Sequence, residues 1–344
     1  MSPKVVVAIL NYNTRAFLEK FIPALKHTDY PNFEILVIDN ASTDDSLDFL
    51  KKYHPEIRQV ALNRNYGFAG GYNEGLKNID GDYYVLLNSD VEVVPNWLNP
   101  VIQHMELELD VAASMPKILS YRDGHLFEYA GAAGGFIDRF AYPFCRGRIF
   151  DVVEKDNSQY NSIRDVFWAS GAAMVVRRKI WEELKGLDAD YFAHMEEIDL
   201  CWRMKNRGYR VTCVPDGKVY HVGGGTLTRE NPKKTRLNFR NTLITMTKNM
   251  DAGELLWKMP VKLVLDGLAG ILFLSKGQWK NTWAIVQAHF LFYSRLSYWI
   301  SKRKESRTMH HSNRVGMLKG SIVWQHFIRR KNSFKEIENA IIHL

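Results

Sequence analysis

Short apolar runs that end in polar residues recur four times in the first ninety positions of the chain. They cover residues 5–10, 34–38, 57–62 and 83–88, and the intervals between them carry apolar residues at helical spacing. A short continuous apolar run is typical of a buried parallel strand, and alternation of such strands with helices is typical of a doubly wound sheet. The pattern therefore predicts an α/β fold with a mostly parallel sheet and a ligand cleft beyond the carboxyl ends of its strands.

Polar side chains and glycines gather where these predicted strands end. The candidates for ligand binding all lie just past a strand: Asn11, Asn13, Asp39, Asn40, Ser42, Arg64, Asn65, Gly67, Gly71, Asn73, Asn88, Ser89 and Asp90. Each also has an ordinary structural explanation, because Asn and Asp form turns and caps and glycine permits positive φ. Polar residues at the ends of four strands favour a binding site over four separate turns. The glycines match neither G-x-G-x-x-G nor Walker A spacing, so a dinucleotide or P-loop site is weakly supported.

Composition narrows the class of protein. With 344 residues, 46% of them hydrophobic, the chain can build one large domain and an appendage. Its three cysteines, Cys145, Cys201 and Cys213, are too few and too irregularly spaced for a disulfide framework or a zinc site. The apolar run near the N-terminus is too short for a secretory signal. We therefore expect a reducing, cytoplasmic setting.

The net charge of +8 is unevenly distributed. Residues 257–344 contain 15 Lys or Arg and 4 Asp or Glu, a balance of +11, whereas residues 1–256 carry −3. This asymmetry predicts an appendage that meets an anionic partner, and it argues against nucleic acid as a partner of the remainder. Apolar segments at 261–274 and 283–300 contain charged residues, and the longest uncharged run, 281–294, is shorter than the ~20 residues that cross a bilayer. Either the helices lie in the membrane interface or a helical hairpin packs on the catalytic domain.

Acidic residues in the second half are candidates for acid–base chemistry. A helix predicted over residues 190–203 begins with Glu196 and Glu197, and acids in a first turn suit the helix dipole whether or not they react. Asp199 and Arg203 are four residues apart and can form an ordinary ion pair. After a strand predicted over residues 209–215, His221 precedes a glycine triplet, Gly223 to Gly225. Its two interpretations are a packed side chain and a contact to metal or phosphate.

The motifs at the strand ends resemble those of the family 2 glycosyltransferases with the GT-A fold, most closely the rhamnosyltransferase branch. The resemblance covers about residues 5–250 and rests on Val-Ala-Ile-Leu-Asn-Tyr-Asn, Val-Ile-Asp-Asn-Ala-Ser-Thr-Asp-Asp-Ser, Asn-x-Gly-Phe-x-Gly-Gly-x-Asn and Leu-Leu-Asn-Ser-Asp, in this order. It implies that Asp39 contacts the nucleobase of a nucleoside diphosphate sugar and that Asp90 coordinates a divalent metal, Mg²⁺ or Mn²⁺. Asn88 stands where many relatives carry Asp, so Asp90 must bind the metal. His221 resembles the His of a segment that closes over the diphosphate.

The acidic helix is similar to the family's Glu-Asp-x-Asp-Leu-Cys-x-Arg motif, whose second acid is taken as the catalytic base. That position is Glu197, with Glu196 and Asp199 as the alternatives. The chemistry needs such groups, because an acceptor hydroxyl loses a proton as it attacks and the departing diphosphate needs a hard cation. On an apolar strand predicted over residues 167–176, the residues expected on the acceptor side are Trp168, Ser170 and Gly171.

Together these observations predict a GT-A catalytic domain over residues 1–250 and a basic helical region over residues 251–344. We expect an inverting transferase that moves rhamnose or another deoxyhexose to a lipid-linked glycan or polysaccharide in cell-surface glycan synthesis. It would lie at the inner face of the cell membrane, held peripherally on an anionic surface. The alternative is an inactive relative that serves as a binding or scaffolding subunit, and a homo-oligomer is left open.

Overall fold

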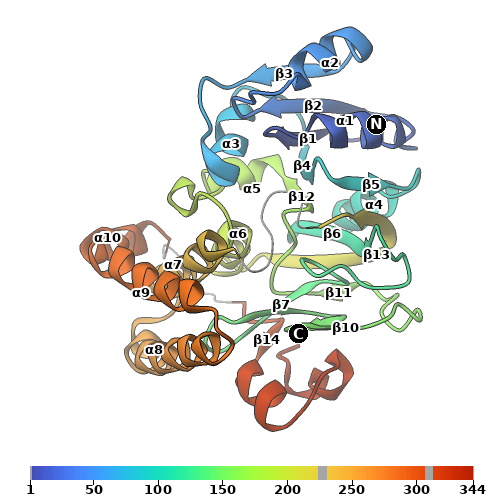
Figure 1. Ribbon diagram of the computed structural model, residues 1–344. Coiled ribbons are helices and arrows are strands. Elements are labelled where there is room, and N and C mark those ends of the chain that lie inside the picture. Colours follow the sequence, from blue (N-terminus) through green and yellow to red (C-terminus); the bar gives the residue numbers. More distant parts are fainter. Residues whose placement is uncertain (1, 224–230, 307–312, 344) are drawn as a thin grey trace.

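The computed structural model describes residues 2–223, 231–306 and 313–343, and its centre is a twisted sheet with helices on both faces (Figure 1). Four strands of this sheet come from the first ninety residues and are parallel to one another, in the order β4-β1-β2-β3. They are β1 (Val5–Asn11), β2 (Phe33–Asp39), β3 (Arg58–Ala61) and β4 (Tyr83–Asn88). The helices that follow the first three are α1 (Arg15–Lys26), α2 (Ser46–Tyr53) and α3 (Gly67–Gly75).

The register of these strands places their polar ends at one edge of the sheet. Asn11 of β1 pairs with Asp39 of β2, and Leu10 pairs with Asn88 of β4. The residues before them are buried, with Val5, Val6 and the rest of that run almost fully covered by the helices. The alternating strands and helices confirm the predicted α/β fold. The prediction succeeded because long buried apolar runs form strands from local sequence alone.

The second half of the sheet is mixed and not parallel. Strand β12 runs antiparallel to both β4 and β6, whereas β13 runs parallel to β6. The strands are β5 (Val91–Val93), β6 (Val111–Ser120), β11 (Arg164–Asp165), β12 (Ala173–Arg177) and β13 (Arg210–His221), and the helices are α4 (Asn99–Leu107), α5 (Arg178–Glu183), a 3₁₀ turn η1 (Ala189–Tyr191) and α6 (Glu196–Lys205). The strand predicted over residues 167–176 begins only at Ala173, because a turn closed by the Ala173 N–H donating to the Ser170 carbonyl precedes it.

A smaller sheet was not predicted. Its order is β10-β9-β8-β7-β14, with β7 (Gly135–Asp138), β8 (Pro143–Cys145), β9 (Arg148–Ile149), β10 (Val152–Val153) and β14 (Met317–Leu318). Strand β14 comes from the C-terminal region and pairs in parallel with β7. The buried Asp138 carboxylate also accepts the Ile322 N–H at 2.9 Å. The region after residue 250 is therefore more than a helical appendage, because its last part completes a sheet begun 180 residues earlier.

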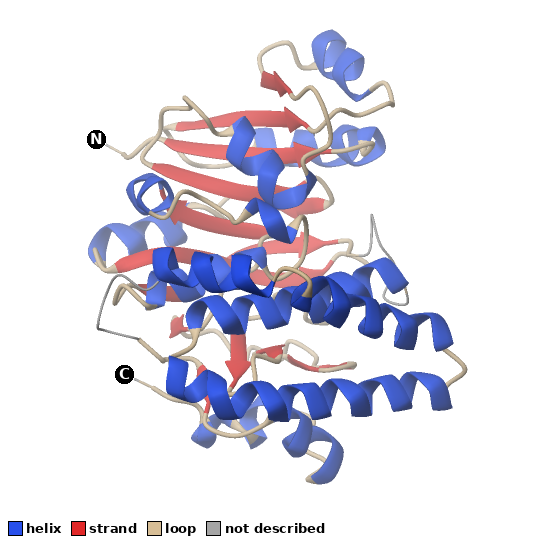
Figure 2. Ribbon diagram, turned by 90° about the vertical axis from the view of Figure 1, so that its left-hand side faces the viewer, coloured by secondary structure: helices blue, strands red, loops and turns tan. Residues whose placement is uncertain are grey.

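Long helices occupy the rest of the C-terminal region. They are α7 (Pro232–Asn249), α8 (Ala252–Ser275), α9 (Trp279–Tyr293) and α10 (Leu296–Ser306), followed by short helical turns at η2 (Trp324–Ile328), η3 (Phe334–Glu336) and η4 (Glu338–Ala340). Helices α8 and α9 form a hairpin that turns at Gly277 and extends beside the small sheet (Figure 2). Within the described ranges, no helix is both long enough and apolar enough to span a bilayer.

Candidate active site

A hydrogen-bonded rim forms where β1 and β2 end. The Asn11 side-chain amide donates to Asp39 Oδ1 at 2.8 Å and to Ser42 Oγ at 2.9 Å, while the Ser42 N–H donates to Asp39 Oδ2 at 3.0 Å. Asp39 is only 2% exposed, so its carboxylate is fixed in one orientation. Asn13 lies outside the rim and accepts the N–H of Thr43 at 2.7 Å, which shapes the turn after β2. These hydrogen bonds hold the polar side chains of the rim in fixed positions.

Asn40 continues this rim toward the start of α3. Its side chain donates to Asn65 Oδ1 at 3.1 Å and to the Gly67 carbonyl at 3.0 Å, and it accepts the Tyr66 N–H at 2.9 Å. Gly67 has φ +73°, and a Cβ there would lie 2.6 Å from the Phe192 carbonyl oxygen. Arg64 stacks on the Tyr66 ring, 4.6 Å from its centroid. Helix α3 therefore begins at a position that only glycine fits. The Arg64 guanidinium lies beside this start of the helix.

Some predicted ligand contacts are structural in this molecule. Both polar groups of Asn73 bind the backbone of Leu187, with Nδ2 donating to its carbonyl at 2.6 Å and Oδ1 accepting its N–H at 3.0 Å. Trp168 is 3% exposed, and its indole N–H donates to the Phe136 carbonyl at 2.8 Å. The Ser170 hydroxyl donates to the Ala130 carbonyl at 2.7 Å. These side chains hold loops and sheets together, and their expected roles as donor or acceptor contacts stay predictions.

Gly71 and Gly171 are close-packing positions. A Cβ at Gly71 would lie 2.7 Å from Leu10 Cδ1, so the residue lets α3 pack directly on β1. A Cβ at Gly171 would lie 3.2 Å from the Phe68 ring and 3.8 Å from Glu197 Cβ. Gly171 thus adjoins the acidic helix, as an acceptor-side residue should, although it has no side chain with which to bind a ligand.

Asp90 and His221 meet where β4 ends and β13 ends. His221 Nε2 lies 3.1 Å from Asp90 Oδ1 and 3.4 Å from Asn88 Nδ2, and His221 Nδ1 lies 3.4 Å from Glu128 Oε2. Burial lowers the pKa of His221, but its contacts with Asp90 and Glu128 outweigh burial and raise that pKa to about 10. Glu128 is a buried carboxylate that sequence reasoning missed, because no motif surrounds it and its partner lies 93 positions away.

These residues fit a divalent cation only in part. Asp90 offers a hard oxygen ligand, and the adjacent His221 could offer Nε2 only after losing a proton, because a pKa of about 10 keeps the imidazole protonated at neutral pH. Glu128 Oε2 lies 3.4 Å from the other imidazole nitrogen, where metal-bound histidines have an outer-shell partner. Within residues 2–223, 231–306 and 313–343, no group of three or more His, Cys, Asp or Glu residues is arranged to hold a metal. A cation here would need oxygens of a bound diphosphate and water. Gly224 and Gly225 of the glycine triplet lie outside the described residues.

Glu196 and Glu197 begin α6 directly after a left-handed residue, Met195, with φ +72°. One carboxylate oxygen of each glutamate is buried, with no hydrogen-bond partner in the part of the chain that the structure describes. Burial raises the pKa of Glu197 to about 7, against the opposing effect of backbone N–H groups. Burial and then the charge of Glu197 raise the pKa of Glu196 well above its usual range. A carboxylate with a pKa near 7 is suited to accept a proton at neutral pH.

Asp199 is placed differently. It is fully buried, and its carboxylate contacts Arg203 Nε at 2.8 Å and Lys248 Nζ at 2.9 Å, and it accepts the Asn249 side-chain amide at 2.8 Å. Burial raises the pKa of Asp199, but Lys248 and Arg203 outweigh burial and lower it overall. The four-residue spacing between Asp199 and Arg203 predicted an ordinary ion pair, and the structure contains it. Asp199 is therefore a poor base, and of the three acids Glu196 and Glu197 remain.

Comparison with known proteins agrees with this geometry. Residues 6–154 match the model of the family "Glycosyl transferase family 2". The chain is 22% identical over 288 residues to the N-acetylglucosaminyl-diphospho-decaprenol L-rhamnosyltransferase of Mycobacterium tuberculosis, which covers 78% of this chain and 91% of that protein. It is 25% identical over 228 residues to the rhamnosyltransferase WbbL of Escherichia coli, covering 63% of this chain and 83% of the relative.

Solved structures share the fold. The crystal structure of GalNAc-T7 with UDP, GalNAc and Mn²⁺ superimposes with a TM-score of 0.62 at 14% identity, covering 95% of this chain and 57% of that one. The family match, the rhamnosyltransferase relatives and the shared architecture lead to one assignment. Residues 6–154 match the family 2 glycosyltransferases, the fold is of the GT-A type, and over most of its length the chain is similar to rhamnosyltransferases.

Proposed function

We propose that this enzyme transfers rhamnose or another deoxyhexose from a nucleoside diphosphate to a hydroxyl of a lipid-linked glycan or polysaccharide, with inversion at the transferred carbon. Two groups of side chains, one at strand ends of the central sheet and one at the start of α6, carry the proposal. Asp90 and His221 lie at the ends of β4 and β13, and Glu197 begins the helix beside Gly171 and Phe68. The names of the relatives, which specify rhamnose and a decaprenyl diphosphate acceptor, support the substrate class.

Each set of residues has one part in the proposed reaction. The rim of Asn11, Asp39 and Ser42 binds the nucleobase, and Asp90 with His221 holds Mg²⁺ or Mn²⁺ at the diphosphate. When bound, the cation neutralises charge that develops on the departing diphosphate. Glu197 accepts the proton of the acceptor hydroxyl. At the same time the hydroxyl oxygen bonds to the sugar carbon, and the diphosphate oxygen leaves from the opposite side of that carbon. A single displacement of this kind inverts the carbon.

The substrate test uses the purified chain with a panel of nucleoside diphosphate sugars and a polyprenyl diphosphate-linked sugar as acceptor. Transfer of a deoxyhexose, abolished by a chelator and restored by Mn²⁺, is the expected result. A protein that binds a donor but neither transfers nor hydrolyses it, with or without metal, would instead be the scaffolding relative.

The pH dependence of transfer follows from the environment of Glu197. The deprotonated carboxylate is the reactive form, and burial raises the pKa of Glu197 to about 7. We therefore expect kcat/KM to rise about tenfold per pH unit below pH 7 and to level off above it. Initial rates at subsaturating donor between pH 5 and 9 measure this. A flat profile between pH 5 and 8 would exclude a base in this environment.

The α8–α9 hairpin supports a second part of the proposal, that the enzyme lies on the inner face of the cell membrane. Each helix exposes one apolar stripe at helical spacing: Trp257, Val261, Val264, Leu268 and Ile271 on α8, and Trp279, Trp283, Val286, Phe290 and Tyr293 on α9. Lys276 and Lys280 are exposed at the turn between them. Apolar stripes beside basic residues suit an interface with anionic lipid, where a lipid-linked acceptor is found.

Vesicle binding tests this placement. We expect the full chain to sediment with anionic vesicles at low salt and to be released at high salt, because screening weakens the attraction of the basic residues. Leu268→Asn with Phe290→Asn should weaken binding about tenfold or more, since each removes apolar surface that lipid would cover. Leu107→Asn with Leu109→Asn, at positions on and beside α4 that are even more exposed, is the control. If both double variants bind as the wild type does, the hairpin does not meet lipid.

A further inference from the structure

The turn that leads to the catalytic acids has an unfavourable backbone conformation. Phe192, His194 and Met195 have φ values of +65°, +69° and +72°, a region that residues with a side chain rarely adopt. Such conformations persist when surrounding contacts hold them in place. The same turn fixes the start of the donor-side helix α3, because the Phe192 carbonyl accepts the Phe68 N–H at 2.6 Å and the Ala69 N–H at 3.3 Å. Its position therefore bears on both halves of the active site.

Helix α7 holds this turn from one side. The buried Asn241 side chain donates to the carbonyls of Tyr191, Ala193 and His194 at 3.1, 2.9 and 2.7 Å. The neighbouring Arg240 donates to the carbonyls of Asp190 and Tyr191 at 2.9 and 3.1 Å. These bonds satisfy carbonyl groups that a strained turn cannot pair within itself.

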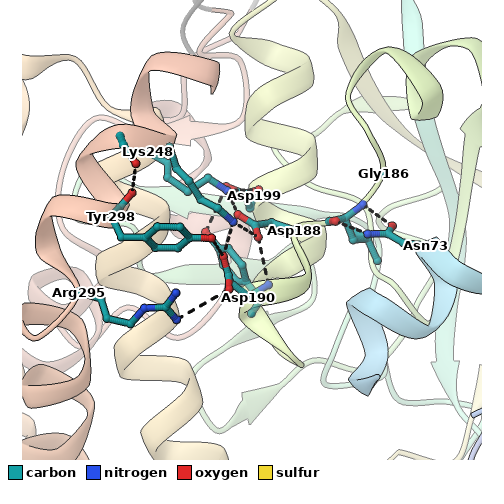
Figure 3. Close-up of polar contacts among 12 residues, drawn as sticks. Asn73, Gly186, Asp188, Asp190, Asp199, Lys248, Arg295 and Tyr298 are labelled. Atoms are coloured by element: carbon teal, nitrogen blue, oxygen red, sulfur yellow. Dashed lines mark hydrogen bonds and ion pairs between the residues drawn. The ribbon is translucent and has the colours of Figure 1, made fainter. Parts of the chain in front are cut away.

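Helix α10 also contacts the beginning of the turn, where Tyr298 lies beside Asp190 (Figure 3). Lys302 Nζ lies 2.6 Å from Asp188 Oδ1 and also pairs with Asp190, whose carboxylate accepts the Tyr298 hydroxyl at 2.6 Å. Asp188 itself caps η1 by accepting the Asp190 N–H at 3.1 Å. Two carboxylates two residues apart repel each other unless a cation lies between them. Lys302 is that cation on the outer side, while Lys248, 2.7 Å from Asp188 Oδ2, serves on the inner side.

We propose that Lys302 is a positioning residue for the transfer reaction: by joining Asp188 to Asp190, it holds the strained turn so that Glu197 and the start of α3 keep their relative places. The proposal rests on the function given above for Glu197. It assigns the C-terminal helices a part in the chemical step, through a contact between residues 112 and 114 positions apart in sequence.

Lys302 can be removed without leaving a buried charge unpaired. Asp188 keeps Lys248, and Asp190, about a quarter exposed, keeps Tyr298 and water. Lys248 is unsuitable for the same test, because it also pairs with the fully buried Asp199. The effect of a Lys302 variant should therefore fall on geometry and not on folding.

The test compares Lys302→Met with Lys302→Arg and with Lys51→Met, which makes the same charge change at an exposed site on α2. A displacement of the catalytic group by about 1 Å can cost up to ~10²-fold in rate, so we expect Lys302→Met to lower kcat about tenfold or more while KM for the donor changes less than twofold. Lys302→Arg should recover most of the rate, and Lys51→Met should match the wild type. Amide hydrogen exchange over residues 188–197 should accelerate in Lys302→Met alone.

Equal kcat and equal exchange in the two Met variants would overturn the proposal. So would a parallel loss of kcat, donor affinity and thermal stability in Lys302→Met, because that pattern is a folding defect. Hydrogen exchange needs no substrate. If the wild type transfers no sugar, the proposed function fails, and the exchange measurement still decides whether Lys302 holds the turn.

Discussion

Glu197→Gln should lower kcat by ~10²-fold or more while donor affinity stays within a factor of two, because the amide keeps the size of the side chain but cannot accept a proton. The rise of kcat/KM through pH 7 should disappear with it, since burial raises the pKa of this carboxyl to about 7 and no other group would then supply that titration. Steady-state kinetics with a saturating acceptor, together with donor titration by calorimetry, measure the two effects separately.

Glu196→Gln is the matched control for this experiment. Burial and then the charge of Glu197 raise the pKa of Glu196 well above its usual range, which favours the protonated form of this side chain. Its loss should therefore cost less. If Glu197→Gln transfers sugar normally and Glu196→Gln is inactive, the catalytic base is Glu196.

Asp199→Asn distinguishes a catalytic defect from a folding defect. The change removes a charge that faces Arg203 and Lys248 in a fully buried position. Breaking a buried ion pair costs about 3–5 kcal/mol, so we expect this variant to lose thermal stability, with any loss of activity following from it.

Asp90→Ala should abolish metal-dependent donor binding and leave the fold intact. The carboxylate lies beyond β4, and its side-chain partner within hydrogen-bonding distance is His221, at 3.1 Å. Without it, the proposed cation keeps one protein ligand, the His221 imidazole, and too few oxygens remain for a hard cation. Donor titration in the presence and absence of Mn²⁺ measures the effect, and thermal unfolding checks the fold.

Glu92→Ala, two positions later on β5, is the control for Asp90→Ala and should bind donor as the wild type does. Unchanged donor affinity of Asp90→Ala in Mn²⁺ would remove Asp90 from the site. Loss of donor affinity in Asp90→Ala without any metal present would show that the carboxylate holds the loop in place and does not bind the cation.

Local sequence determined the first half of the fold. Strands β1 to β4 and the helices between them follow from apolar runs and helical spacing, because a strand buried on both faces needs no partner-specific signal. The small sheet escaped prediction for the opposite reason. Strands as short as Arg148–Ile149 and Met317–Leu318 have no periodicity of their own, and β14 exists only through pairing with β7.

Sequence motifs also predicted where the site lies. Asp39, Asp90 and Glu197 follow or precede elements whose ends the fold brings to one side of the sheet, and strand-end polarity together with family resemblance singled them out. Their chemical roles remain predictions. Asn73 and Trp168 carried the same kind of signal, yet Leu187 and Phe136 use up their polar groups. A side chain's free hydrogen-bonding capacity depends on neighbours that local sequence does not name.

Tertiary structure alone decided how the acids differ. Glu197 has a pKa near 7 because the fold desolvates it and places no counter-ion beside it within the part of the chain that the structure describes, whereas Asp199, two positions on, is neutralised by Lys248 from a helix 49 residues away. Glu128 meets His221, and Lys302 meets Asp188, only when distant elements pack together. Hydrophobic spacing acts within one element and can be read from the chain, while desolvation and ion pairing depend on which elements meet, which only the folded molecule determines.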